Sequence, residues 1–196
     1  MVQVFPSSIA AALFYLVYLL LFMAEVVGGV ILPRAHRRGT EITKKDKGSS
    51  QLLSLSNSIC IIIAFSFALS GEAMLPSWVF YPGIVLMILG IVLRQWSMAV
   101  LRGFFSGTVG IQEGQKIVDR GPYRQVRHPA YTGVLLFFVG FGLALQSWGA
   151  ILLLVLLFGL AFGYRIYVEE RVLVSELGEE YVKYTKRTKR LIPYIL

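Results

Sequence analysis

Long apolar runs alternate with short polar segments along most of this chain. Five runs approach or reach the length of about 20 apolar residues that a transmembrane helix needs. They cover residues 9–32, 52–70, 79–100, 131–145 and 149–167, of which the fourth is the shortest. Only residues 146–148 separate the last two runs, which predicts a tight helical hairpin. The pattern therefore predicts an all-α integral membrane protein with five transmembrane helices.

The composition agrees with a membrane protein and argues against a sizeable soluble domain. The chain of 196 residues is 56% hydrophobic and 15% charged, whereas soluble domains average about 25% charged residues. Its net charge of +8 comes from Lys and Arg in the loops, so the expected partner is the lipid bilayer and not a nucleic acid. With one cysteine, Cys60, and two histidines, the sequence predicts neither a disulfide framework nor a metal site.

The distribution of Lys and Arg predicts how the chain crosses the membrane. Residues 33–50 hold six basic residues and residues 101–129 hold five, whereas residues 71–77 hold none. In membrane proteins, the excess of Lys and Arg lies in the cytoplasmic loops. We therefore expect the N-terminus outside, with the basic loops and the C-terminus in the cytoplasm.

Three charged residues lie within the apolar runs: Glu25 in the first, Arg94 in the third and Arg165 in the fifth. Arg94 is about two turns from the cytoplasmic end of its run, so its long side chain is expected to reach the membrane interface. Glu25 is either a partner for an arginine within the membrane or a group near the interface. The sequence leaves both interpretations of Glu25 open.

Glycines in the last two runs predict that the hairpin packs closely. Gly159 and Gly163 form a GxxxG pattern in the last run. The run before it supplies three further glycines, Gly133, Gly140 and Gly142. Small residues let membrane helices approach one another. After the hairpin, residues 169–186 keep a helical spacing of apolar residues, which predicts an amphipathic helix on the cytoplasmic surface.

A polar stretch, GPYRQVRHPAYTG, interrupts the apolar sequence at residues 121–133. After the hairpin it is followed by Arg165, Glu169 and Glu170. Ionisable residues at a membrane boundary are costly and usually functional, so these two segments form the candidate site. Two simpler interpretations stay open: the proline of the stretch starts the next helix, and Arg165 and Glu169, four residues apart, form a surface ion pair.

The order of these motifs resembles the isoprenylcysteine carboxyl methyltransferase family. GPYRQVRHPAYTG, a membrane hairpin and EERVLVSELGEEYVKYTKRTKRLIPYI follow one another as in that family, over residues 112–196. The resemblance implies transfer of a methyl group from S-adenosylmethionine to the carboxylate of an isoprenylated cysteine, which gives a methyl ester and S-adenosylhomocysteine. Together with the apolar runs, it divides the chain into an N-terminal three-span membrane region, residues 1–100, and a catalytic region, residues 101–196, made of a cytoplasmic loop, the hairpin and the C-terminal helix.

The resemblance also assigns site residues by position. Arg165 matches the arginine at the substrate carboxylate, and Glu169 matches a carboxylate at the cofactor, so these two are the implied catalytic residues. The implied cofactor-binding residues are Gln115, Lys116, Ile117, Val118, Tyr123, His128, Pro129, Ala130, Tyr131 and Glu169. A carboxylate acceptor is already ionised near neutral pH. We therefore expect catalysis by positioning, without a general base.

Three other functions stay open at the level of sequence. Related membrane methyltransferases that act on a phospholipid amine share the RHPxY and EE signature. An NADPH-dependent sterol-type reductase has a similar C-terminal membrane motif, and a non-catalytic membrane protein that keeps the signature is the third. The sequence does not say whether the acceptor is a protein terminus or a small lipid, nor does it give the oligomeric state.

Overall fold

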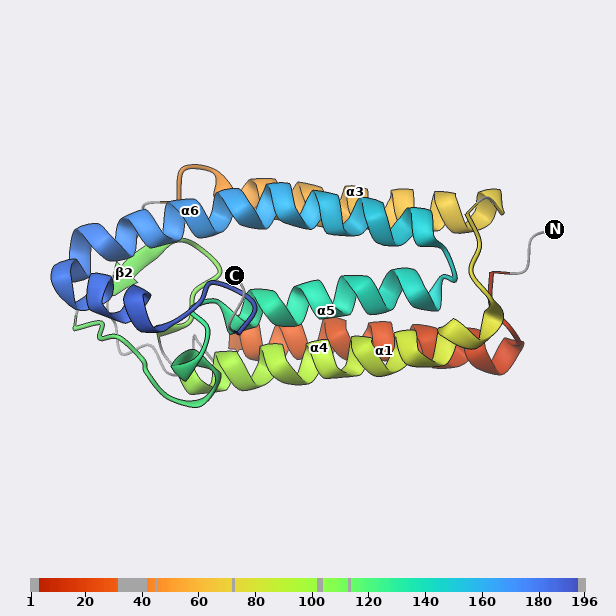
Figure 1. Cartoon of the computed structure of the whole chain (residues 1–196), viewed down its shortest axis with the longest axis horizontal. Helices are drawn as coiled ribbons and strands as arrows, with labels where there is room; N and C mark the ends of the chain where they lie inside the picture. Colours follow the sequence, from red (N-terminus) through yellow and green to blue (C-terminus); the bar gives the residue numbers. More distant parts are fainter. Residues whose placement is uncertain are drawn as a thin grey trace.

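The computed structural model describes residues 4–31, 42–44, 46–71, 73–101, 104–112 and 114–193. Its main helices are α1 (Ser8–Glu25), α3 (Ser49–Ser70), α4 (Phe80–Leu101), α5 (Pro129–Ala144) and α6 (Trp148–Arg187). The shorter elements are the π-helix η1 (Val26–Ile31), the 3₁₀-helices η2 (Ser77–Val79) and η4 (Gly121–Arg124), and the antiparallel strands β1 (Ile42–Lys44) and β2 (Gly110–Gln112). The helices lie side by side along the long axis, and β2 lies beside α6 at one end (Figure 1).

Four helical segments are long and apolar enough to cross a membrane: Ser8–Gly29, Ser49–Ser70, Ser77–Leu101 and Trp148–Arg187. Large apolar side chains on these helices are exposed, as expected for faces that contact lipid. The protein is therefore an integral, multi-pass membrane protein. Helix α5 has 16 residues and is about 24 Å long at 1.5 Å per residue, less than the hydrocarbon core of about 30 Å. A fifth transmembrane span stays a prediction.

The tight hairpin between α5 and α6 is confirmed. Helix α5 ends at Ala144 and α6 begins at Trp148. Between them, Gln146 adopts a left-handed φ of 55°, and its side-chain amide donates a hydrogen bond to the Val4 carbonyl at 3.1 Å. The Ser147 hydroxyl then accepts a hydrogen bond from the backbone N–H of Ala150 at 3.2 Å, which caps the first turn of α6.

Glycines bring α4 and α5 into direct backbone contact. A Cβ atom built on Gly90 of α4 would lie 2.5 Å from the carbonyl oxygen of Gly133 in α5. About two turns further along α5, a Cβ on Gly140 would lie 2.6 Å from the carbonyl oxygen of Gly83. Gly133 and Gly140 therefore do allow close helix packing. We expected α6 as their partner, but the helix they contact is α4.

The GxxxG pattern of α6 does not pack the hairpin, so that prediction is wrong. A Cβ atom on Gly159 or Gly163 would have no heavy atom within 4 Å, and both residues are exposed. Of the predicted glycines, Gly142 does face α6, because its Cβ would lie 2.6 Å from Cγ1 of Ile151. Along the rest of its apolar part, α6 packs mainly against α3 (Figure 1).

Glu25 and Arg94, the charged residues of the first and third apolar runs, bind each other. Arg94 donates hydrogen bonds to both carboxylate oxygens of Glu25, one of them from Nη2 at 2.8 Å. Its Nη1 reaches the Ala130 carbonyl oxygen at 3.4 Å. The carboxylate gives the guanidinium a strong, bidentate partner. That Arg94 extends to the membrane interface stays a prediction. Of the two interpretations of Glu25, the structure selects the arginine partner.

The amphipathic extension predicted for residues 169–186 is the continuation of α6. The helical path is interrupted at Gly178, with φ 57° and ψ −134°, a backbone conformation that glycine adopts without steric cost. The chain after Gly178 folds back, so that Tyr181 and Tyr184 are buried. This final part of α6 packs near η4 and the start of α5, at the same end as β2 (Figure 1).

Candidate active site

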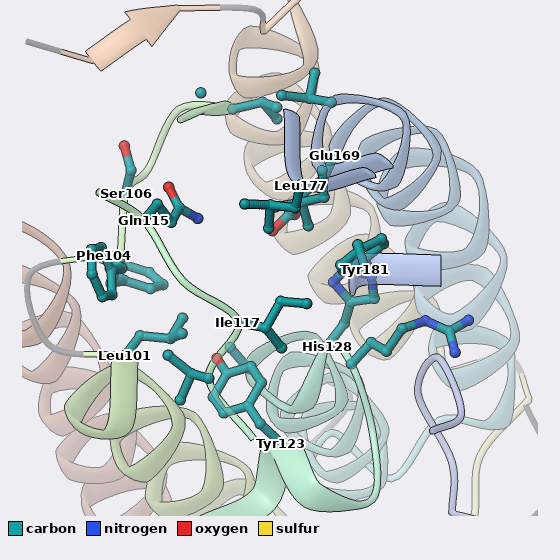
Figure 2. A pocket seen from close by; sticks show the side chains of 18 of the residues that line it. Leu101, Phe104, Ser106, Gln115, Ile117, Tyr123, His128, Glu169, Leu177 and Tyr181 are labelled. Carbon is teal, nitrogen blue, oxygen red and sulfur yellow. The ribbon is translucent and has the colours of Figure 1, made fainter. Parts of the chain in front are cut away.

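A pocket of about 120 Å³ lies at the end of the bundle that carries β2 (Figure 2). It collects nine of the ten predicted cofactor-binding residues: Gln115, Lys116, Ile117, Val118, Tyr123, His128, Ala130, Tyr131 and Glu169. Pro129, the tenth, is buried in the first turn of α5 and does not line the pocket. Arg165 lines it as well. Segments separated by the hairpin thus meet around one space.

Backbone hydrogen bonds to the C-terminal segment hold residues 127–129, the RHP turn, in place. The N–H of Arg127 donates to the Lys189 carbonyl at 2.7 Å, and the N–H of His128 donates to the Arg190 carbonyl at 3.0 Å. Pro129 then starts α5 in its first turn, where its missing N–H costs nothing. The interpretation of Pro129 as a helix start is therefore confirmed, together with its place beside the pocket.

Glu170 binds the basic residues around this turn. One of its carboxylate oxygens accepts from Nε of Arg127 at 2.8 Å and lies 3.3 Å from Nε2 of His128. The other accepts from Arg190 at 3.0–3.1 Å. Because Glu170 does not line the pocket, its part in the EE pair is to fix the RHP turn against α6.

Glu169 and Arg165 are connected through the hydroxyl of Tyr131. Nε of Arg165 donates to this oxygen at 3.2 Å, and the hydroxyl donates to Glu169 at 2.7 Å. The ring of Tyr131 is stacked on that of His128, with centroids 5.5 Å apart and planes 10° apart. Between these described side chains we find no direct ion pair of Arg165 with Glu169, so the simpler interpretation as a surface pair is wrong.

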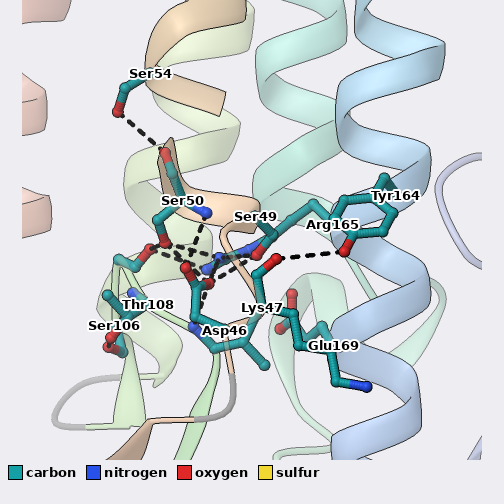
Figure 3. A network of polar contacts seen from close by, with 12 residues as sticks. Asp46, Lys47, Ser49, Ser50, Ser54, Ser106, Thr108, Tyr164, Arg165 and Glu169 are labelled. Carbon is teal, nitrogen blue, oxygen red and sulfur yellow. Dashed lines mark hydrogen bonds and ion pairs between the residues drawn. The ribbon is translucent and has the colours of Figure 1, made fainter. Parts of the chain in front are cut away.

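The principal partner of Arg165 is Asp46, a residue that the sequence interpretation missed (Figure 3). Nη1 of Arg165 lies 2.6 Å from Oδ1 of Asp46, 2.8 Å from the Ser49 hydroxyl and 3.0 Å from the Ser50 hydroxyl. Nη2 donates to the Gly107 carbonyl at 2.9 Å. The guanidinium is almost fully buried in this network. Asp46 has only a weak signal in the sequence, because an aspartate followed by Ser49 and Ser50 is typical of a helix start.

Asp46 stays ionised in this setting. Burial raises the pKa of its carboxyl, but hydrogen bonds from the Ser49 hydroxyl, the backbone N–H groups of Ser50 and Val109, and the Ser50 hydroxyl outweigh burial and lower the pKa to about 2. The same carboxylate therefore joins the start of α3, the segment before β2 and Arg165 of α6. Segments on both sides of the pocket depend on it.

A second cavity, of about 320 Å³, lies between the helices next to the first. Its wall is mainly apolar and includes Phe137, Phe138 and Phe162, together with the Glu25–Arg94 pair. Both cavities are lined by Tyr131, Arg165, Phe105 and Ser106. These four residues therefore mark the boundary between a pocket at the end of the bundle and a cavity among the helices.

Comparison with known proteins gives one family match and several relatives. Residues 78–180 match the family described as Phospholipid methyltransferase. Protein-S-isoprenylcysteine O-methyltransferase B of Arabidopsis thaliana is 29% identical over 120 residues, which are 60% of this chain and 61% of the plant protein. Protein-S-isoprenylcysteine O-methyltransferase of Schizosaccharomyces pombe is 34% identical over 109 residues, 55% of this chain and 46% of the yeast protein.

A solved structure is similar as well. It is the eukaryotic intramembrane Ras methyltransferase ICMT (isoprenylcysteine carboxyl methyltransferase), with a TM-score of 0.66 and 26% sequence identity over 72% of this chain and 53% of that chain. The matches thus cover 46% to 61% of the lengths of these three proteins.

The fold and the site define an integral membrane protein with a charged pocket at one end of its helices and an apolar cavity beside it. Because the family match covers more than half of the 196 residues, the chain belongs to the phospholipid methyltransferase family. The resemblance to isoprenylcysteine carboxyl methyltransferases is confirmed by the relatives and by the solved structure. Membership of this family implies a methyl donor.

Proposed function

We propose that this protein transfers a methyl group from S-adenosylmethionine to the carboxylate of a lipid-modified, isoprenyl-type cysteine or a similar amphiphilic acid, giving a methyl ester. The observation that carries the proposal is the meeting of two cavities at Tyr131 and Arg165. A polar cofactor enters from the end of the bundle, and an apolar tail has a place among the helices. The names of the relatives support the same acceptor class.

The residues of the first pocket fit S-adenosylmethionine in their chemistry. When bound, this cofactor supplies an electrophilic methyl group on a sulfonium cation. The Glu169 carboxylate balances positive charge in the pocket, and the faces of Tyr123 and Tyr131 favour a cation. Apolar side chains such as Ile117 and Leu177 offer surface to a nucleobase. We assign the cofactor-binding role to the pocket residues named above.

Arg165 has the acceptor role in this proposal. Nη2 carries two N–H groups, and its partner among the described residues is the Gly107 carbonyl, so one N–H is left for an acceptor carboxylate. That carboxylate is already ionised near neutral pH, and methyl transfer to it needs alignment instead of a base. The apolar wall of the second cavity keeps water from the acceptor.

We also propose a topology: α5 is a short fifth span, the N-terminus is outside, and the pocket and the C-terminus face the cytoplasm. Lys116 and Arg127 line the pocket, and Lys47 lies beside Arg165 in Figure 3. Basic residues thus gather at the pocket end, as expected for a cytoplasmic side. Protease cleavage within residues 114–120 in sealed inside-out vesicles, with protection in right-side-out vesicles, tests this orientation.

Glu169→Gln should weaken S-adenosylhomocysteine binding about 10- to 100-fold, because a charge-assisted contact is lost from the pocket. Calorimetric titration of the purified protein measures the change. Glu179→Gln is the matched control: its carboxylate is 93% exposed and lies 3.8 Å from Lys183 on the helix surface, so its affinity should stay within about twofold. Equal losses in the two variants would contradict the assigned place of Glu169.

A second candidate function is methyl transfer to a phospholipid amine. The observation that favours it is the Asp46–Arg165 ion pair, which balances the charge of the arginine and leaves the carboxylate of Glu169 in the pocket. A cationic or neutral acceptor would meet less repulsion there than Arg165 alone suggests. The family description, Phospholipid methyltransferase, names this acceptor class for other members.

Methylation of two acceptors by the purified protein tests the proposal. We expect transfer of labelled methyl from S-adenosylmethionine to an S-prenylated N-acyl cysteine, and none to phosphatidylethanolamine. The product should release methanol in alkali, because an ester is hydrolysed there and an N-methyl amine is not. Alkali-stable label in the phospholipid would instead support the second candidate. Label in neither acceptor, with cofactor bound, would refute both acceptor assignments.

A further inference from the structure

One tyrosine of the pocket has a buried hydroxyl without a partner. Tyr181 lines the pocket and is only 3% exposed. Its hydroxyl oxygen is fully buried, yet it makes no hydrogen bond to any described residue. Buried polar groups in native proteins are nearly always hydrogen-bonded, and a clear exception needs an explanation. A ligand that occupies the pocket is one such explanation.

The neighbouring tyrosine shows what a satisfied hydroxyl looks like on the same helix. Tyr184, one turn after Tyr181, also lines the pocket and is 4% exposed. Its hydroxyl donates a hydrogen bond to the Tyr123 carbonyl oxygen at 2.7 Å. The two rings lie 5.9 Å apart. The Tyr184 hydroxyl therefore stabilises the wall of the pocket, whereas the Tyr181 hydroxyl makes no hydrogen bond within the described part of the chain.

A bend in α6 at Gly178 places Tyr181 in the wall of the pocket. Gly178 interrupts α6 with a left-handed φ of 57°, and the helix that follows returns toward His128 and Glu169. Figure 2 shows Leu177 next to Glu169 and Tyr181 next to His128. The position of Tyr181 is thus set by the fold and not by a hydrogen bond of its own.

The surroundings make the Tyr181 hydroxyl a hydrogen-bond donor. Burial raises the pKa of Tyr181, and the negative charges of Glu170 and Glu169 raise it further, against a smaller opposite effect of Arg127. The phenol therefore keeps its proton at neutral pH. A neutral phenol with no hydrogen-bond acceptor among the described residues can donate to an acceptor atom on a ligand.

We propose that Tyr181 is a cofactor-binding residue whose hydroxyl donates a hydrogen bond to an oxygen or nitrogen acceptor of bound S-adenosylmethionine or S-adenosylhomocysteine. The proposal rests on the proposed function, because it takes the same pocket as the cofactor site. It goes beyond it by giving a role to the segment after Gly178, to which the motif comparison assigned no contact. Cofactor binding then satisfies a hydroxyl that the ligand-free protein leaves unpaired.

Tyr181→Phe and Tyr184→Phe form a matched pair that tests this. In the ligand-free protein in detergent, Tyr181→Phe should have a melting temperature equal to or above that of the wild type, because it removes an unpaired buried hydroxyl. Tyr184→Phe should melt lower, because it leaves the Tyr123 carbonyl without its donor. For S-adenosylhomocysteine, Tyr181→Phe should raise Kd about tenfold, the effect of one lost hydrogen bond.

Two results would overturn the role of Tyr181 while leaving the proposed function standing. Wild-type protein that binds S-adenosylhomocysteine, with a Tyr181→Phe variant that binds equally well, would show that the ligand does not use the hydroxyl. A lower melting temperature of ligand-free Tyr181→Phe would show that the hydroxyl already has a partner in the protein. If the folded wild type binds no S-adenosylhomocysteine, the proposed function fails, and the role of Tyr181 fails with it.

Discussion

Gly90→Leu should prevent the normal packing of α4 against α5 and cost more than about 3 kcal/mol of stability, the upper end of the usual range for overpacking. A Cβ atom at this position would lie 2.5 Å from the Gly133 carbonyl oxygen and 2.7 Å from the Phe137 backbone nitrogen. Both obstacles are backbone atoms of a helix, so no side chain can move aside. The helices would have to separate, and α5 carries Ala130 and Tyr131, which line the pocket.

Thermal unfolding in detergent, followed by circular dichroism, measures this loss, and methyl transfer should fall with it. Gly159→Leu is the matched control, because it makes the same substitution within another apolar helix. A Cβ at Gly159 would meet no atom within 4 Å, so we expect a change within about 0.5 kcal/mol. Equal destabilisation by both substitutions would contradict the assignment of the close contact to α4 and α5.

These glycines show that the positions of the helices could be predicted from the sequence, whereas their packing partners could not. The lengths of the apolar runs predicted the helices well, because run length and the span of a bilayer are directly related. The partner of each helix was not readable, since a GxxxG pattern indicates a small-residue face and does not say which helix covers it. Gly159 and Gly163 fit the pattern but contact no neighbouring helix, whereas Gly83 and Gly90 were not singled out and are in close backbone contact with α5.

In the candidate site, residues in local motifs were likewise predicted, whereas a residue paired over a long sequence distance was not. Tyr131, His128 and Glu169 were found because they belong to short motifs whose spacing is visible along the chain. Asp46 was missed because it lies 119 positions before its partner Arg165, in a loop rich in Lys and Arg. The long-range pairing of Asp46 with Arg165 depends on the packing of α3 against α6, which no local pattern encodes. The predicted division at residue 100 stays a prediction.

Asp46→Asn should be the most damaging single substitution outside the matched motifs. Arg165 is almost completely buried, and Asp46 is the carboxylate in direct contact with it. Removing one partner of a buried ion pair leaves the other charge uncompensated, at a cost of about 3–5 kcal/mol. The same change frees the segment around Gly107 and Val109, which lies beside the cofactor pocket. We expect both a lower melting temperature and loss of turnover with the carboxylate acceptor.

Acid unfolding offers an independent measure of the hydrogen bonds that the Asp46 carboxylate accepts from Ser49, Ser50 and Val109. The pKa of Asp46 is about 2 in the folded protein, against an ordinary value of 3.8. A lowered folded-state pKa contributes stability that is fully present above the unfolded pKa and is lost as the pH falls through the folded pKa. Wild-type protein should therefore lose this contribution between pH 3.8 and about 2, whereas the Asn variant has none to lose. A parallel acid dependence of the two proteins would contradict the lowered pKa.

A double-mutant cycle separates the action of Asp46 on Arg165 from a general loss of structure. If Asp46 acts through Arg165, then Asp46→Asn should cost much less in an Arg165→Gln background than in the wild type, with a coupling of about 0.5–3 kcal/mol in stability. Acceptor turnover should show the same non-additivity, because an arginine that is absent cannot be misplaced. Ser49→Ala, which removes one weaker contact of the same guanidinium, should give a smaller loss in the same direction. Strictly additive losses would mean that Asp46 acts independently of Arg165.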